Sequence, residues 1–235
     1  MPDASKNTSD SPARTAPVRP RDAASLILYR RSVAGGIEVL LGRRPGTAKF
    51  MPDVYVYPGG AVDSSDARAR PASVLNPAVT GRMAVRNSPA RARAMAMAAV
   101  RETFEETGLL VTAPASPGKI SDETWQRMEQ LGVAPDLQRL CYIGRAITPT
   151  MRPRRFHARF FAVDAGDVEG TLEGNGELID LAWVRSDRTD DLAMRHVTRH
   201  MLAETETMLA SGDPNWIGDS MFTQRFGKLH VSRQS

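Results

Sequence analysis

The segment from Ser88 to Gly108 constrains the fold more than any other part of the sequence. A serine followed by a proline is typical of a helix N-terminus, because the serine side chain caps a free backbone N–H and the proline fixes φ at the first helical position. A glycine favours the left-handed turn that ends a helix. The pattern therefore predicts a helix over residues 89–107.

This predicted helix has two different faces. At 100° per residue, Met97, Val100 and Phe104 lie within roughly 60° of one another, which favours packing against a core. The opposite side carries three acids, Glu102, Glu105 and Glu106.

The three acids indicate a metal site. Carboxylates about 5 Å apart repel by roughly 3 kcal/mol per pair at an effective dielectric of about 20, and a bound divalent cation removes that repulsion. Oxygen ligands on one face suit Mg²⁺ or Mn²⁺, which also bind substrate phosphates. The alternative is a solvated acidic face beside Arg101, since glutamate is a good helix former.

The remaining pattern predicts a layered α/β or α+β domain. Further helices are expected over residues 122–131 and from about 190 to 209. Short or alternating apolar runs predict strands at 25–29, 37–41, 54–57, 109–112, 137–144, 157–163 and 178–184. Residues 64–87 show little periodicity, which indicates an irregular insertion at about 67–88.

Length and composition set the domain organisation. With 235 residues, 41% of them apolar, the chain can build one sizeable core. Residues 1–22 hold few large apolar side chains and are expected to be a disordered tail. This leaves a single domain over residues 23–235, with a C-terminal helical segment at about 190–235.

The sequence favours a cytoplasmic protein. Cys141 is the only cysteine, so no internal disulfide can form, and no apolar run is long enough to span a membrane. No apolar segment typical of a secretory signal follows the N-terminal basic residues.

The basic side chains favour a phosphorylated substrate. Only four of the 31 Lys and Arg residues are lysine, and arginine binds phosphate with two parallel hydrogen bonds. Nucleic acid is disfavoured as a partner, because the arginines within residues 67–100 have no aromatic platform beside them.

Residues 101–109, RETFEETGL, resemble the second half of the Nudix box, which reads R-E-U-x-E-E-x-G-U with apolar residues at U. Thr103 is the one mismatch in this half, and Gly108 is the glycine of the pattern. The upstream tripeptide Pro58-Gly59-Gly60 resembles the beginning of the first half, with Gly60 as its opening glycine.

The two halves are further apart than in the family pattern. Asp66 stands where the family usually has a glutamate, and 34 residues separate it from Arg101 where seven are usual. The box is thus split by an insertion. We expect the insertion to bulge outward without separating Gly60 from the helix.

Residues 39–60 strengthen the resemblance and narrow it. They contain LLGRR and then FMPDVYVYPGG, which resemble the Nudix branch that includes the peroxisomal coenzyme A diphosphohydrolase. The resemblance implies an α/β/α sandwich with a mixed sheet and a loop-helix-loop motif. It also implies Mg²⁺- or Mn²⁺-dependent hydrolysis of a nucleoside diphosphate linked to another group X, with coenzyme A or acyl-CoA cut to phosphopantetheine and 3′,5′-ADP.

The resemblance also implies roles for the residues of the box. Arg101 would pair with a carboxylate of the box and fix its rotamer. Gly60, Asp66 and Gly108 would complete the motif. The implied metal ligands are the side chains of Glu102, Glu105 and Glu106 and the backbone carbonyl of Gly59.

Candidates outside the box are fewer. The family's general base often comes from another loop, and Glu177 is preferred over Glu173 because it directly precedes a predicted strand. Arg44 and Arg159 are the candidates for binding the diphosphate. His196 and His200 are four residues apart, a spacing that zinc ligands can have, but no third ligand is evident.

Two other functions stay open. One is a nucleotide pyrophosphatase that acts on ADP-ribose or NADH. The other is a non-catalytic Nudix-fold regulator that binds nucleotides. This alternative is supported by three departures from the family pattern, which are Asp66, Thr103 and the interrupted box. Since Nudix enzymes commonly dimerise, a homodimer is also expected.

Overall fold

The longest helix confirms the strongest sequence prediction. The computed structural model describes residues 18–48, 50–225 and 228–233. In it α3 (Pro89–Thr107) begins after Ser88, whose side chain accepts a hydrogen bond from the backbone N–H of Arg91, and ends at Gly108 with φ of 73°.

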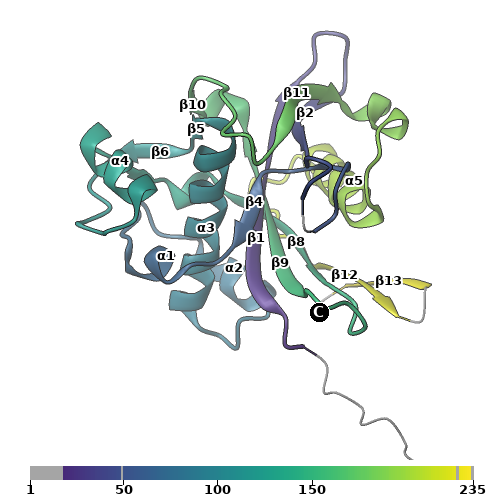
Figure 1. Cartoon of the computed structure of the whole chain (residues 1–235), viewed down its shortest axis with the longest axis horizontal. Coiled ribbons are helices and arrows are strands. Elements are labelled where there is room, and N and C mark those ends of the chain that lie inside the picture. Colours follow the sequence, from purple (N-terminus) through teal and green to yellow (C-terminus); the bar gives the residue numbers. More distant parts are fainter. Residues whose placement is uncertain (1–17, 49, 226–227, 234–235) are drawn as a thin grey trace, which may run out of the picture.

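One mixed sheet of nine strands forms the centre of the molecule (Figure 1). Its main path runs β11-β2-β1-β9-β8-β12-β13, while β3 pairs with β2 and β4 pairs with β1. The pairs β1–β9 and β8–β12 are parallel, and the other pairs are antiparallel. The strands are β1 (Arg21–Arg31), β2 (Ile37–Arg43), β3 (Tyr55–Val56), β4 (Gly59–Ala61), β8 (Cys141–Ile147), β9 (Phe156–Asp164), β11 (Ile179–Arg185), β12 (Ser220–Arg225) and β13 (Lys228–Arg233).

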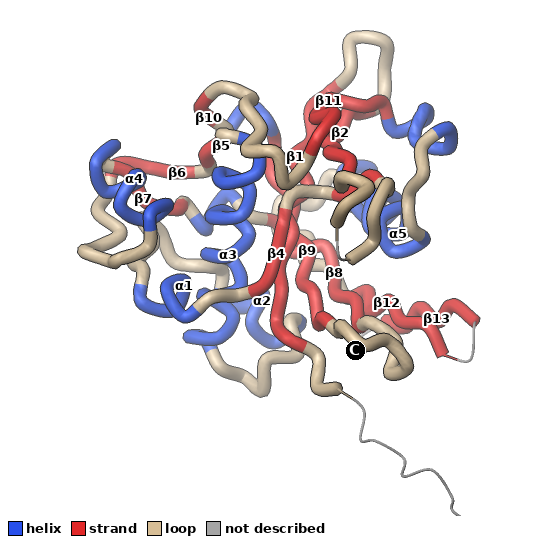
Figure 2. The backbone as a smooth tube through the Cα atoms, viewed as in Figure 1, coloured by secondary structure: helices blue, strands red, loops and turns tan. Residues whose placement is uncertain are grey.

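Helices cover both faces of this sheet, as Figure 2 shows. On one face α3 packs with α1 (Ser64–Arg68), α2 (Pro77–Arg82) and α4 (Glu123–Leu131). On the other face lies α5 (His196–Ser211). The short elements between them are β5 (Leu109–Leu110), β6 (Thr112–Pro114), β7 (Val133–Pro135), β10 (Glu169–Gly170) and three 3₁₀ turns, Leu137–Arg139, Ala165–Asp167 and Ser186–Asp191.

Two hydrophobic cores follow from the alternation of side chains along the central strands. In β1, Leu26 and Leu28 face the α3 side, whereas Ile27 between them faces the α5 side. In β9 the neighbours Phe161 and Phe160 divide in the same way. The result is the predicted α/β/α sandwich with a mixed sheet.

The insertion is more ordered than the sequence pattern indicated. Residues 67–88 were predicted to be irregular, yet α2 lies within them and α1 overlaps their start. Val79 and Met83 are buried in the α3-side core. The insertion therefore contributes to the core of the domain.

Three predicted boundaries are wrong. Arg21 and Asp22 belong to β1, so the domain begins before residue 23, and the rest of the predicted tail over residues 1–17 lies outside the described residues. Residues 137–139 form a 3₁₀ turn rather than the start of a strand. Helix α5 begins at His196, because Ser186–Asp191 forms a 3₁₀ turn instead.

The C-terminal prediction needs the largest correction. The region from about 190 to 235 was expected to be helical, but β12 and β13 form an antiparallel hairpin that extends the sheet. β12 joins the sheet by parallel pairing to β8, with Phe222 opposite Ala146.

Within the described ranges, no helix combines the length and apolar character needed to cross a membrane.

Candidate functional site

Arg101 is the centre of the site. Its Nε atom and one terminal nitrogen donate to both carboxylate oxygens of Asp66, at 2.7 and 3.1 Å. Its other terminal nitrogen lies 2.9 Å from Glu102 Oε1 and 3.1 Å from Glu105 Oε2. It also donates to the carbonyl oxygen of Ala61, at 3.1 Å, so one buried guanidinium joins both halves of the split box.

Asp66 can reach Arg101 because α1 presents it. Asp63 caps this short helix, and the Asp66 side chain accepts a hydrogen bond from the backbone N–H of Asp63 in return, which completes a capping box. Asp66 is fully buried. Burial raises the pKa of its carboxyl group, and the bonds from Arg101 oppose that rise. The aspartate thus reaches Arg101 despite its shorter side chain.

Glu106 and Glu102 lie against the glycines of the first half. The backbone N–H of Gly59 donates to Glu106 Oε2 at 2.8 Å. A Cβ atom at Gly60 would lie 2.4 Å from the Glu102 carboxylate, so a larger residue there would displace that acid. The insertion therefore does not separate Gly60 from the helix, as the sequence analysis expected.

Burial changes the acidity of these two carboxyl groups. It raises the pKa of Glu106 from 4.5 to about 8, which the Gly59 N–H opposes and the charge of Glu102 reinforces. It raises the pKa of Glu102 to about 7, although Arg101 acts in the opposite direction. For Arg101, burial opposes the charged form, but the hydrogen bond that it donates to Asp66 and the charges of the nearby acids hold its pKa above the usual value.

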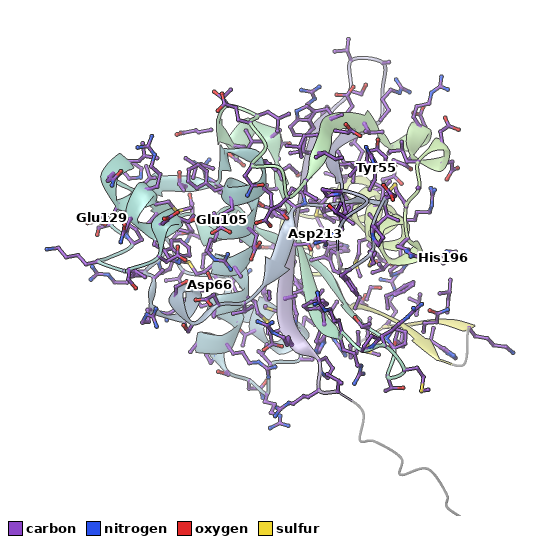
Figure 3. The ribbon with its side chains drawn as sticks, viewed as in Figure 1. Tyr55, Asp66, Glu105, Glu129, His196 and Asp213 are labelled. Atoms are coloured by element: carbon purple, nitrogen blue, oxygen red, sulfur yellow. The ribbon has the colours of Figure 1, made fainter. Side chains whose placement is uncertain are left out.

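Glu105 differs from the other two acids. Its Oε1 atom accepts a hydrogen bond from the hydroxyl of Thr124 in α4 at 2.6 Å, while Oε2 lies beside Arg101. Figure 3 labels Asp66 and Glu105 in the layer that contains α3 and α4. Thr124 was not predicted as a site residue, because its only signal in the sequence is its place in the first turn of the predicted helix over residues 122–131.

Thr103, the mismatch in the box, is fully buried, and its hydroxyl donates to the carbonyl oxygen of Ala99 at 2.8 Å. This bond satisfies the hydroxyl within the helix, so a threonine fits where the pattern has an apolar residue.

The loop with the predicted general base lies at the C-terminal end of α3. The backbone N–H of Glu173 donates to the carbonyl oxygen of Thr107 at 2.9 Å. A Cβ atom at Gly108 would lie 2.5 Å from the carbonyl oxygen of Thr171, so the loop approaches this glycine closely. Glu177 is exposed, and its charge contributes to the raised pKa of Glu106.

The two predicted diphosphate-binding arginines lie in different places. Arg44 is close enough for its charge to lower the pKa of Glu106, and its buried Nε atom has no hydrogen-bond partner among the described residues. Arg159 is fully buried and donates to the carbonyl oxygen of Met83 at 3.0 Å and to Asp22 Oδ1 at 3.1 Å.

Arg159 therefore lies at the wrong end of α3 for the predicted role. Arg91, in the first turn of α3, shares Asp22 with it. A helix rises 1.5 Å per residue, so Arg91 and Glu105 are about 20 Å apart along the axis. The guanidinium of Arg159 already has protein acceptors, which corrects the expectation that it binds substrate.

The donor set at the C-terminal half of α3 fits a hard divalent cation by its chemistry, since it consists of carboxylate oxygens. Two of these carboxyl groups have raised pKa values, and a cation would stabilise their charged forms. In the described part of the chain, however, no three His, Cys, Asp or Glu side chains are already arranged around a metal position. Arg101 and Thr124 each contact one oxygen of Glu105.

The two histidines belong to a different region. His200 Nε2 lies 2.6 Å from the hydroxyl of Ser220, and its ring packs against Phe222. Figure 3 labels His196 beside α5, across the sheet from Glu105. The contacts of His200 indicate a structural role for that residue.

Comparison with known proteins agrees with the motif and the fold. No family model matches the chain. The protein named "Putative nudix hydrolase 7" of Caenorhabditis elegans is 29% identical over 176 residues, covering 70% of this chain and 51% of that protein. The chain thus spans about half the length of this curated relative.

A solved structure gives the same result. The crystal structure of a NUDIX hydrolase from Alicyclobacillus acidocaldarius aligns with a TM-score of 0.60 and 29% identity, covering 79% of this chain and 91% of that one. The fold, the position of Arg101 between the two halves of the box, and these two relatives agree. The chain has the fold of the Nudix hydrolases and is similar in sequence to these two members of that family.

Proposed function

We propose that this protein is a divalent-metal-dependent hydrolase of a nucleoside diphosphate linked to a second group. One observation carries the proposal. Although 34 residues separate Asp66 from Arg101, Gly59 and Gly60 contact the carboxylates of Glu106 and Glu102 directly. A buried acidic site of this kind is costly without a cation to hold, and Mg²⁺ or Mn²⁺ fits its oxygen donors.

The residues divide the work in a simple way. Glu102 and Glu106 would hold the metal, with Glu105 beside them and the Gly59 carbonyl as a further donor. When bound, the metal would neutralise the diphosphate and favour ionisation of the attacking water. Arg101 fixes the carboxylates. Arg44, whose charge acts on Glu106, would bind a phosphate oxygen.

Glu177 is the proposed general base. Its carboxylate is exposed on a loop, and its charge acts on Glu106, which supports a position near the acidic site. It would accept a proton as the water oxygen forms a bond to one phosphorus and the bridging P–O bond breaks. The second phosphate leaves with the bridging oxygen.

Coenzyme A or an acyl derivative is the proposed substrate, cut to phosphopantetheine and 3′,5′-ADP. Support comes from the sequence pattern over residues 39–60, which includes Arg44. ADP-ribose and NADH are the alternatives with the same bond chemistry. We propose a cytoplasmic location and a homodimer on the grounds given by the sequence.

Mass-spectrometric product analysis tests the proposal. The protein is incubated with Mg²⁺ and coenzyme A, ADP-ribose or NADH, beside the variant Glu106→Gln. We expect phosphopantetheine and 3′,5′-ADP from coenzyme A, and a loss of turnover of at least about 100-fold in the variant, because the substitution removes a charged metal ligand.

The control is Glu206→Gln, which makes the same change at an exposed position of α5. It should retain full activity. If ADP-ribose or NADH yields AMP and coenzyme A yields no product, the proposed substrate is wrong but the proposed reaction stands. Full activity in Glu106→Gln would refute the site, and tight nucleotide binding without hydrolysis of any substrate would favour the regulator.

A further inference from the structure

Thr124 contacts the acidic site from outside both halves of the box. Its hydroxyl donates to Glu105 Oε1 at 2.6 Å, which is within the range of a strong hydrogen bond to a carboxylate. We infer that Thr124 is a positioning residue for Glu105 and that it sets the affinity of the site for a divalent cation. The inference rests on the proposed function.

The helix that presents Thr124 is fixed relative to the box. The next residue, Trp125, is fully buried, and its indole N–H donates to the hydroxyl of Ser65 in α1 at 3.2 Å. Asp122 caps the N-terminus of α4 by accepting hydrogen bonds from the backbone N–H groups of both residues. The backbone that carries Thr124 is therefore held in place by Asp122 and by the neighbouring Trp125.

Glu105 needs such a contact more than the other two acids. Its side chain is 30% exposed, whereas that of Glu102 is 13% exposed and Glu106 is buried against Gly59. Arg101 holds one oxygen of Glu105, but it shares the same terminal nitrogen with Glu102. Without the Thr124 hydroxyl, the 3.1 Å contact with Arg101 is the hydrogen bond that the described neighbours still donate to the Glu105 carboxylate. The rotamer of Glu105 is then less restricted.

Restricting the rotamer matters for cation binding. A carboxylate oxygen has two lone pairs, so Glu105 can keep the hydrogen bond from Thr124 while it takes part in the site. Partners that orient a metal-binding side chain change metal affinity or activity by about 10- to 100-fold when they are removed. Thr124 occupies such a position in this chain.

Direct Mn²⁺ binding tests the inference. Calorimetry on the metal-free full chain compares the wild type with Thr124→Val, which keeps the volume and removes the hydroxyl, and with Thr124→Ser, which keeps the hydroxyl. We expect the dissociation constant for Mn²⁺ to rise about 10-fold in the valine variant and to change less than about twofold in the serine variant. At saturating Mn²⁺, the KM for substrate should stay unchanged.

The matched control is Ser116→Ala. It removes the 2.6 Å bond from Ser116 to Glu129, which anchors the other end of α4 without contacting Glu105. If it weakens Mn²⁺ binding as much as Thr124→Val does, the effect is a general loosening of α4 and the inference fails. Thr124→Ala is the second variant should the valine form fail to fold, which thermal unfolding reveals.

The outcomes separate the two proposals. Hydrolysis by the wild type together with equal Mn²⁺ affinity in Thr124→Val would overturn the role of Thr124 alone. Mn²⁺ binding that depends on Thr124, in a protein that hydrolyses none of the substrates, would overturn the proposed function alone. A wild type that binds no Mn²⁺ overturns both.

Discussion

At the scale of single residues, Arg101 reduces the repulsion within the acidic cluster. The spacing of the glutamates correctly indicated that they repel one another. From the sequence, a bound metal was expected to offset this repulsion. The guanidinium offsets part of it, by contacting Glu102, Glu105 and Asp66. Helical spacing predicts the neighbours of Arg101 within α3. It cannot predict Asp66 or Thr124, since those contacts depend on how distant segments pack.

The raised pKa values predict how stability depends on pH. Glu102 and Glu106 have pKa values of about 7 and 8 in the folded protein and 4.5 as the ordinary value. As pH rises from 6.5 to 8.5, the unfolded chain has already lost these protons while the folded protein must still release them. The free energy of unfolding of the metal-free protein should therefore fall across this window and level off above it.

Thermal unfolding with a chelator at several pH values measures this dependence. Glu106→Gln is the comparison, since it removes the group with the larger rise and should flatten the curve. The window starts at pH 6.5 because of His157, whose pKa burial lowers from 6.5 to about 3. Between these two pH values, the neutral form of His157 makes the free energy of unfolding rise with pH, which would mask the effect of the glutamates. A wild-type curve no steeper than that of the variant would contradict the assigned pKa of Glu106.

At the scale of elements, the insertion shows where periodicity fails as a guide. Residues 64–87 are rich in arginine, alanine and proline, so neither a helical nor a strand period emerges. The segment nevertheless folds, because Asp63 caps α1, Asn76 caps α2, and Ala69 after α1 and Val79 within α2 are buried in the core beneath α3. The capping residues can be recognised in the sequence. The burial of the apolar side chains cannot, because it depends on the surface of α3 against which the insertion packs.

Met83 provides a test of this packed insertion. It is fully buried in the α3-side core directly after α2. Met83→Ala should destabilise the protein by about 2–5 kcal/mol, as cavity-forming substitutions do. Denaturant unfolding measures the change. Val74→Ala, at a position that is 73% exposed in the same insertion, should change stability by less than about 0.5 kcal/mol, and equal effects of the two would mean that the insertion is not part of the core.

At the scale of the whole molecule, the sheet separates two cores with different tasks. The α3-side core supports the acidic site, while the α5-side core lies beneath α5 and the C-terminal hairpin. The sequence predicted the central strands because they are apolar on both faces. It did not predict the hairpin, since β12 pairs in parallel with β8, about 75 residues earlier in the chain, and β13 is exposed and mostly polar.

This separation predicts that stability and chemistry respond independently to a change in the second core. Phe222 of β12 is 9% exposed and packs against His200 of α5, with ring centroids 5.3 Å apart. Phe222→Ala should cost about 3–5 kcal/mol of stability, because it leaves a cavity between α5 and the sheet. Below its melting temperature, the variant should bind Mn²⁺ as the wild type does, since the carboxylates lie across the sheet. Leu229→Ala on exposed β13 is the control and should leave stability within about 0.5 kcal/mol. Weakened Mn²⁺ binding in a folded Phe222→Ala protein would show that the two cores are coupled through the sheet.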